Sequence, residues 1–213
     1  MKTKDKIVHE SLKLFNQRGE RAVTTNHIAE HLGMSPGNLY YHFRNKEDII
    51  KSIFELYIEF ISHSIDPPND KISAQEYLAN YCHQVFDSIW KFRFFHASMP
   101  SILYRDDELH EQYLAAHHML EQRAFAAIVH LKIEKFIEID NDDIAELVEL
   151  MRLVTGFWVN YCMANTMKGK ITKTQVSLGV LKLIRLISPY GTPAGKTVFN
   201  QLRTQYEKAS NAE

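Results

Sequence analysis

Residues 22–46 read Ala22-Val-Thr-Thr-Asn-His-Ile-Ala-Glu-His-Leu-Gly-Met-Ser-Pro-Gly-Asn-Leu-Tyr-Tyr-His-Phe-Arg-Asn-Lys46, two short helical segments separated by a glycine. Gly33 can adopt the positive φ of a tight turn without strain, and Ala29 is small enough to lie where two helices cross. Ser35 followed by Pro36 is a typical N-cap and first-turn pair, so the second helix begins sharply. That helix carries small polar residues, two tyrosines and a histidine, which suit a DNA surface better than a protein interior. The segment therefore predicts a helix-turn-helix.

The side chains of this segment divide into buried and exposed sets. Four apolar residues would hold the two helices to their neighbours: Ile28, Leu32, Leu39 and Phe43. Gly37 permits close approach to a DNA groove, and Asn38 offers both a donor and an acceptor to a base edge. The tyrosine hydroxyls, His42 and Lys46 suit contact with phosphate. The alternative, in which these residues only cap a packed bundle, is disfavoured because spacing, capping and exposed chemistry agree on DNA binding.

Helical periodicity extends over almost the whole chain, and no convincing strand pattern appears. The predicted helices on either side of the segment run from residue 4 to 18 and from 45 to about 64, and Asp66-Pro-Pro-Asn-Asp70 is the clearest break. Later helices are predicted at residues 73–90, 92–104, 106–137, 140–169, 172–187 and 192–208, with a proline bending or shortening the second of them. The expected fold is all-α with about nine to ten helices. It comprises an N-terminal three-helix head (residues 1–47), a linking helix to about residue 64, and a helical body (residues 65–213).

The charge is distributed unevenly between the two ends of the chain. Residues 1–51 hold nine Lys and Arg against six Asp and Glu, although the whole chain has a net charge of −1. A mildly basic end on a slightly acidic body suits a polyanion at one end only. A nucleoid-coating architectural protein would need a strongly basic chain, and a sequence pI of about 6.8 does not fit that role.

The sequence also indicates a compartment. Cys82 and Cys162 are too few and too far apart for a disulfide framework, which favours a reducing cytosol. No apolar stretch follows the charged N-terminus, and the most apolar segment, residues 153–164, is shorter than the roughly 20 residues of a membrane span. We therefore expect a soluble cytoplasmic protein without a signal peptide.

The N-terminal 60 residues resemble the tetracycline-repressor (TetR/AcrR) family of one-component bacterial regulators, whereas the body matches only as a helical chain of suitable length. The residues that carry the resemblance are in register without gaps: Thr24, Thr25, Ile28, Ala29, Gly33, Ser35, Gly37, Leu39, Tyr40, His42, Phe43 and Lys46. Met34 and Ile49 stand where valine and leucine are common in the family, and neither is a DNA-contact position. The resemblance implies base or phosphate contact from Thr25, Asn26, Ser35, Gly37, Asn38, Tyr40, Tyr41, His42 and Lys46. Thr24 and Pro36, which flank these residues, complete the candidate interface.

The resemblance further implies that the body dimerises through its last two large helices, here about residues 142–167 and 172–187. A dimer is also expected on physical grounds, because one recognition helix buries too little surface for strong specific binding. The first helix carries Leu150, Val154, Phe157, Trp158 and Tyr161, and the second carries Val176, Val180, Leu183, Ile184 and Ile187. Each stripe is wide enough to serve both core and partner, and internal core alone is the alternative.

The resemblance also implies that the body binds a small effector. Large adaptable side chains could line a pocket for an apolar or amphipathic molecule: Phe86, Trp90, Phe94, Phe95, Met99, Tyr104, Met119, Met151 and Phe157. Core packing is the favoured alternative for most of them.

His110, His117 and Glu121 lie on one predicted helix, and the last two are spaced as a pair that could share a metal. Surface histidines are the favoured alternative, so no metal or cofactor is predicted.

The sequence lacks the common catalytic signatures: the Gly-x-Ser-x-Gly elbow, the phosphate loop, His-Glu-x-x-His and Gly-x-Gly-x-x-Gly. The prediction is therefore a transcriptional regulator and not an enzyme. Repression is the expected mode, because it is the commoner one among similar proteins. The expected partners are a (pseudo)palindromic double-stranded DNA operator, a second copy of the chain and a small effector that releases the DNA.

Overall fold

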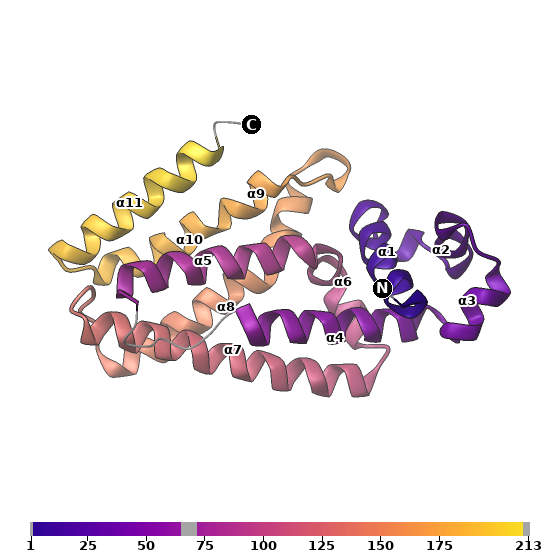
Figure 1. The fold of residues 1–213 in the computed structure, drawn as a ribbon. Coiled ribbons are helices and arrows are strands. Elements are labelled where there is room, and N and C mark those ends of the chain that lie inside the picture. The colour runs from indigo at the N-terminus through magenta and orange to yellow at the C-terminus, as the bar shows by residue number, and fades with distance from the viewer. Residues whose placement is uncertain (1, 65–71, 211–213) are drawn as a thin grey trace.

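The computed structural model describes residues 2–64 and 72–210, and in these residues the chain is a set of α-helices, α1 to α11, joined by loops and 3-10 turns (Figure 1). Among the described residues, extended pairing is limited to an isolated bridge between Ile137 and Gly191. The all-α prediction is confirmed. No helix within these residues is long and apolar enough to cross a membrane. The break predicted at residues 66–70 lies outside the described residues.

Three short helices form the head at one end of the molecule (Figure 1). They are α1 (Thr3–Arg18), α2 (Thr25–Leu32) and α3 (Pro36–His42). Gly19 ends α1 with φ of 80° and Gly33 ends α2 with φ of 65°, conformations that glycine adopts without strain. The predicted seam is present: Ile28, Leu39 and Phe43 are buried, and Leu32 is half-buried against the same core.

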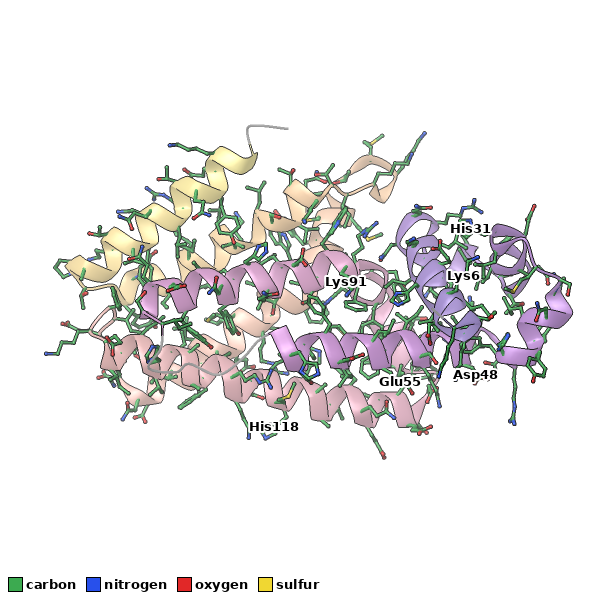
Figure 2. The ribbon with its side chains drawn as sticks, viewed as in Figure 1. Lys6, His31, Asp48, Glu55, Lys91 and His118 are labelled. Carbon is green, nitrogen blue, oxygen red and sulfur yellow. The ribbon has the colours of Figure 1, made fainter. Side chains whose placement is uncertain are left out.

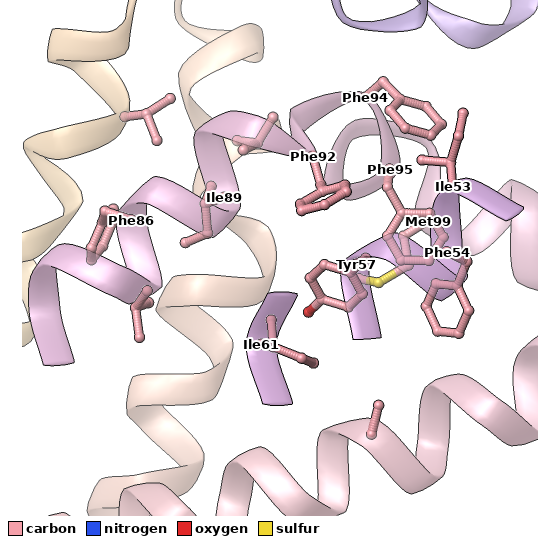
Figure 3. Close-up of a cluster of buried hydrophobic side chains, with 14 of the residues drawn as sticks. Ile53, Phe54, Tyr57, Ile61, Phe86, Ile89, Phe92, Phe94, Phe95 and Met99 are labelled. Atoms are coloured by element: carbon pink, nitrogen blue, oxygen red, sulfur yellow. The ribbon is translucent and has the colours of Figure 1, made fainter. Parts of the chain in front are cut away.

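Helix α4 (Lys46–Ser64) leads from the head into the body. Asn45 caps it by accepting a hydrogen bond from the Asp48 amide at 2.8 Å. One face of α4 is buried in an aromatic cluster, in which the ring centroids of Phe54 and Phe95 are 5.2 Å apart and those of Tyr57 and Phe92 are 5.3 Å apart (Figure 3). The linking helix therefore shares its core with the body.

Within residues 72–210 the body contains seven α-helices: α5 (Ala74–Lys91), α6 (Arg93–Leu103), α7 (Asp107–Ile133), α8 (Asn141–Ala164), α9 (Lys173–Ser177), α10 (Gly179–Ile187) and α11 (Pro193–Ser210). Four of them begin where a side chain accepts a hydrogen bond from an amide three residues later. These caps are Ser73 at 3.2 Å, Asp106 at 3.1 Å, Thr172 at 3.1 Å and Thr192 at 3.1 Å. The predicted starts of these helices are therefore correct to within one residue.

The predicted ends are less accurate. The helices expected to reach residues 137 and 169 end at Ile133 and Ala164. After the first of them Lys135 has a positive φ of 58°, and after the second Thr166 is extended, with φ of −125° and ψ of 131°. The helix expected at residues 172–187 is divided into α9 and α10. At this division Gly179 packs so closely on Phe86 that a Cβ would overlap the ring. This division therefore lies at a close contact with α5, which local sequence does not reveal.

Pro100 lies inside α6 without ending it. A proline removes the backbone N–H that would bond to the carbonyl four residues earlier, here that of His96. The side-chain amide of Asn160 on α8 donates to this carbonyl at 3.0 Å. This hydrogen bond gives the His96 carbonyl a donor and links α6 to α8.

Gly195, in the first turn of α11, provides a test of how α11 packs against the segment that follows α7. A Cβ at Gly195 would overlap the backbone carbonyl oxygen of Phe136, which cannot move aside like a flexible side chain. We expect Gly195→Ala to lower the free energy of unfolding by about 2 kcal/mol. Gly156→Ala in α8 is the matched control, since nothing lies within 4 Å of that Cβ, and it should be neutral or stabilising by up to about 1 kcal/mol. Urea denaturation followed by circular dichroism measures both, and equal stability of the two variants would contradict the packing.

Candidate nucleic-acid interface

Helix α3 turns its polar side chains outward. Tyr40 and Tyr41 are 49% and 84% exposed, whereas Leu39 beside them is fully buried. The other predicted contact residues also reach the surface: Thr24, Asn26, Ser35, Pro36, Gly37 and Asn38 are exposed, and Thr25, His42 and Lys46 are half-buried. The helix is therefore anchored by one face and presents the other to solvent.

The start of α3 is held in a defined position. Ser35 Oγ accepts a hydrogen bond from the Asn38 amide at 3.2 Å, and Pro36 occupies the first turn. The Met34 amide donates to the Ala29 carbonyl at 3.0 Å, which closes the turn after α2. These local bonds orient Asn38 and the tyrosines before any ligand arrives.

The structure brings the start of α2 next to the end of α3. Thr25 Oγ1 lies 3.0 Å from the hydroxyl of Tyr40. Thr24 accepts a bond from the His27 amide at 3.3 Å, which caps α2. Thr24, Thr25 and Tyr40 line one surface depression together with Arg44 and Lys46. Residues from three helices can therefore contact one stretch of nucleic-acid backbone.

Lys46, expected to contact phosphate, is engaged in an ion pair within the protein. Its ammonium group lies 2.7 Å from Glu20 Oε1 and donates to the Glu20 carbonyl at 3.1 Å. The Glu20 side chain is fully buried, and Arg105 Nη2 approaches the same oxygen at 3.3 Å. Burial by itself would raise the pKa of Glu20, but the hydrogen bond and charge of Lys46, followed by Arg105, outweigh it and lower the pKa below the usual 4.5. Because a buried carboxylate needs a cation, the ammonium group of Lys46 is directed inward.

Arg44 is a residue that sequence reasoning missed. It is exposed directly after α3 and shares the surface depression with Thr25 and Tyr40. The sequence signal for Arg44 was a basic residue shortly after the predicted recognition helix. Its guanidinium is suited to contact with phosphate.

The head is held to both ends of α6 by polar contacts. At the start, Asn16 Nδ2 donates to the Lys91 carbonyl at 2.7 Å, and the Phe94 amide donates to Asn16 Oδ1 at 3.1 Å. At the other end, Arg21 donates to Ser101 Oγ at 3.2 Å. A displacement of α6 would therefore be transmitted to α1 and the turn that follows it.

The body encloses a cavity of about 60 Å³ between six helices. Its lining comprises Tyr57 of α4, Tyr81, Val85, Ser88 and Ile89 of α5, His96 of α6, His117, Leu120 and Ala124 of α7, Met151, Arg152, Thr155 and Gly156 of α8, and Leu183 of α10. Of the nine residues predicted to line an effector pocket, Met151 lines this cavity.

The other eight predicted pocket residues lie elsewhere. Phe86, Phe94, Phe95 and Met99 are buried in the core, and Trp90 and Met119 are half-buried against it. Phe94 packs on Phe15 of the head with ring centroids 5.2 Å apart. Tyr104 and Phe157 are 90% and 50% exposed. Aromatic composition indicated a large core correctly, but helix phase and packing decide which side chains border a cavity.

The three residues considered for a metal point in different directions. His117 borders the cavity, whereas His110 is exposed. Glu121 bonds Arg152 at 2.9 Å and lies 3.9 Å from His118, which projects from the outer side of α7 (Figure 2). Across residues 2–64 and 72–210, no group of three or more His, Cys, Asp or Glu is arranged to hold a metal.

Helix α8 carries an exposed apolar stripe. Leu150, Leu153, Phe157 and Tyr161 lie at helical spacing and are between 41% and 60% exposed. The other residues predicted for this stripe, Val154 and Trp158, are half-buried and pack on the core. The second predicted stripe is internal, because its members on α9 and α10 are all buried. An apolar stripe of this kind marks an association surface.

The comparisons with known proteins agree over the whole length of the fold. Residues 7–53 match a sequence profile described as bacterial regulatory proteins, tetR family, and residues 56–199 match one described as bacterial transcriptional repressor. A TetR-family transcriptional regulator from Marinobacter aquaeolei VT8 is 35% identical, with a TM-score of 0.88 over 97% of this chain and 99% of that one.

Two regulators show weaker similarity in sequence. The HTH-type regulator YttP of Bacillus subtilis (strain 168) is 25% identical over 60% of this chain, and the match spans 63% of YttP, less than two thirds of its length. The icaADBC biofilm operon negative regulator IcaR of Staphylococcus epidermidis is 24% identical over 62% of this chain and 80% of its own length.

The ion pairs of Glu20 generate a pH-dependent prediction. A lowered pKa contributes stability above pH 4.5, and this contribution is lost as the pH falls below 4.5. We expect Glu20→Gln to lower the free energy of unfolding at pH 7 by about 2 kcal/mol and to flatten its decline in acid. Glu10→Gln, in a more exposed pair with Lys13, is the control and should change stability by less than about 1 kcal/mol. Denaturation series from pH 3 to 7 measure both, and a Glu20→Gln profile identical to that of the wild type would exclude a role for this pair.

Proposed function

Because this chain belongs to the TetR family of bacterial transcriptional regulators, we propose that it is a repressor that binds a (pseudo)palindromic operator as a homodimer and is released by a small molecule. It is a regulator and not an enzyme. The repressor assignment is supported by the matched description, bacterial transcriptional repressor, and by the similarity to the negative regulator IcaR.

The outward face of α3 is the observation that carries DNA binding. We assign α3 to the major groove, with Asn38 reading a base edge and Tyr40 held by Thr25. Tyr41 and Arg44 contact phosphate from the exposed end of the helix. Lys46 acts indirectly, because its pair with Glu20 holds the start of α4 in place.

The apolar stripe on α8 supports the homodimer. Four exposed apolar side chains on one helix face would be buried against the same face of a second copy, which is how two-fold interfaces form. Two recognition helices then contact successive major grooves.

The contacts of α4 and α6 support separate roles for the head, the linking helix and the body. The head (residues 1–47) binds DNA, α4 links it to the body (residues 65–213), and the body holds the effector. Tyr57 of α4 and His96 of α6 both border the cavity, and α6 is bonded to the head through Asn16 and Ser101. A ligand that prefers one position of these helices lowers DNA affinity by its differential affinity for the two states.

The DNA-binding proposal is tested on an operator obtained by selecting bound fragments from the source genome. We expect Asn38→Ala to weaken binding about tenfold and to relax the base preference at one position, because it removes a base-edge contact. Tyr41→Ala should weaken binding to all sequences, because phosphate contacts carry no base information. Fluorescence anisotropy at fixed salt concentration measures both.

Tyr104→Ala is the matched control for these variants, since Tyr104 is a similarly exposed tyrosine outside the helix-turn-helix. It should leave DNA affinity unchanged. If Asn38→Ala and Tyr41→Ala bind as tightly as the wild type, α3 is not the reading helix.

The dimer proposal predicts that a charge in the apolar stripe separates the subunits. Phe157→Glu should give a monomeric mass by light scattering at micromolar concentration, because an unpaired carboxylate would be buried in the interface. Leu114→Glu is the control on α7, where Leu114 is 57% exposed, and it should remain dimeric. A monomeric wild-type protein under these conditions would refute the dimer.

A further inference from the structure

The body cavity is bordered by histidine nitrogens that lack well-formed hydrogen bonds. His96 is 4% exposed, and in the described part of the chain neither of its ring nitrogens has a partner in hydrogen-bond geometry, although the Gly156 backbone lies near enough to raise its pKa slightly against the larger effect of burial. His117 Nε2 is likewise buried and unpartnered. Buried polar groups are normally satisfied by protein, water or ligand. Both residues border the cavity, so the missing partners are expected inside it.

The cavity is lined by basic side chains that carry N–H donors and, among the described residues, by no acidic side chain. The lining includes Arg152 and the two histidines but no Asp or Glu. Arg152 bonds Glu121 at 2.9 Å, which uses one of the five N–H donors of a guanidinium. Each neutral imidazole adds one N–H donor and one acceptor nitrogen. The rest of the lining is largely apolar, with Val85, Ile89, Leu120, Met151 and Leu183.

We propose that this cavity binds a small organic acid, with one carboxyl group between His96, His117 and Arg152 and a short hydrocarbon part against the apolar lining. The proposal rests on the proposed function, since this ligand would be the effector. As the acid, the carboxyl group donates to one imidazole nitrogen and accepts from an N–H group. As the carboxylate, it accepts from Arg152 and from a histidine.

Other common ligand groups fit the site less well. An alkylammonium group would find no carboxylate in the lining, and a phosphate would bring more negative charge than the single arginine, already paired with Glu121, can balance. The volume of about 60 Å³ suits a small molecule and is well below that of typical drug-sized pockets. An alcohol could bond the histidines and accept from Arg152, but it would lack the charge attraction that a carboxylate gains from the guanidinium.

Carboxylate binding should be coupled to proton uptake. Burial lowers the pKa of His96 and of His117 to about 4 in the free protein, so both are neutral at pH 7. The groups that face them are Tyr57 from α4, Tyr81 from α5, Tyr113 from α7, and Arg152 paired with Glu121. None of these supplies an unpaired negative charge, so an entering carboxylate raises the histidine pKa values or enters protonated. Either route makes binding tighter as the pH falls from 8 to 6, by up to about tenfold per unit.

The experiment is isothermal titration of the full-length protein without DNA. The probes are straight-chain monocarboxylates from acetate to octanoate together with benzoate, and the corresponding primary alcohols. We expect at least one carboxylate to bind at least tenfold more tightly than its alcohol, more tightly at pH 6 than at pH 8, and with proton uptake measured in buffers of different ionisation enthalpy. His96→Phe keeps the ring volume and removes the nitrogens, so it should weaken that binding at least tenfold.

His110→Phe is the matched control, because this exposed histidine on α7 lies outside the cavity lining, and it should bind like the wild type. If His96→Phe does not fold, His117→Gln, at a half-buried position, provides the same comparison. Alcohols that bind as tightly as carboxylates would overturn the carboxyl assignment. Absence of binding by every probe, which would indicate a cavity filled only with water, would overturn the site.

Operator affinity separates this inference from the proposed function. A carboxylate that binds the free protein but leaves operator affinity unchanged would refute release by this ligand and support the site. Sequence-specific DNA binding without any carboxylate binding would support the regulator and overturn the inference about its ligand.

Discussion

A carboxylate buried from solvent must be neutralised, and in this protein that requirement joins three parts of the chain. Glu20 lies between the first two helices of the head, Lys46 begins α4, and Arg105 follows α6. The two cations outweigh the cost of burying the acid, so its pKa is lowered and not raised. Apolar packing between head and body is non-directional, so the orientation of the head depends on this ion-paired group together with the hydrogen bonds of Asn16 and Arg21 to α6.

Helix α6 lies between the head and the cavity. Its start is bonded by Asn16, and its first turn contributes His96 to the cavity. Its proline leaves a carbonyl without a backbone donor, and Asn160 of α8 donates to that carbonyl. An occupant of the cavity would therefore contact a helix that is bonded both to α8 and to the head. Packed helices of this kind shift between discrete arrangements instead of bending continuously, which is a requirement for a switch.

The aromatic side chains have a different role from the one that their abundance indicates. Phe54, Tyr57, Phe92 and Phe95 form a cluster between α4 and the body. Of these four side chains Tyr57 also borders the cavity, whereas the three phenylalanines fill space in the core. The polar residues of the cavity, His96, His117 and Arg152, are scattered over three helices in sequence. These three side chains border the same cavity, so the proposed ligand site lies in the small volume where α6, α7 and α8 approach one another.

Local patterns in the sequence were sufficient for the helix-turn-helix. Gly33, Ser35 and Pro36 specify turn and cap geometry within a few residues, and the periodicity around Leu39 shows which face of α3 is buried. The same local reasoning located most helix starts, because caps are local. The inward direction of Lys46, the break at Gly179 and the lining of the cavity could not be obtained in this way. Each depends on a partner far away in the chain, such as Glu20, Phe86 or Arg152, and only packing brings these partners together.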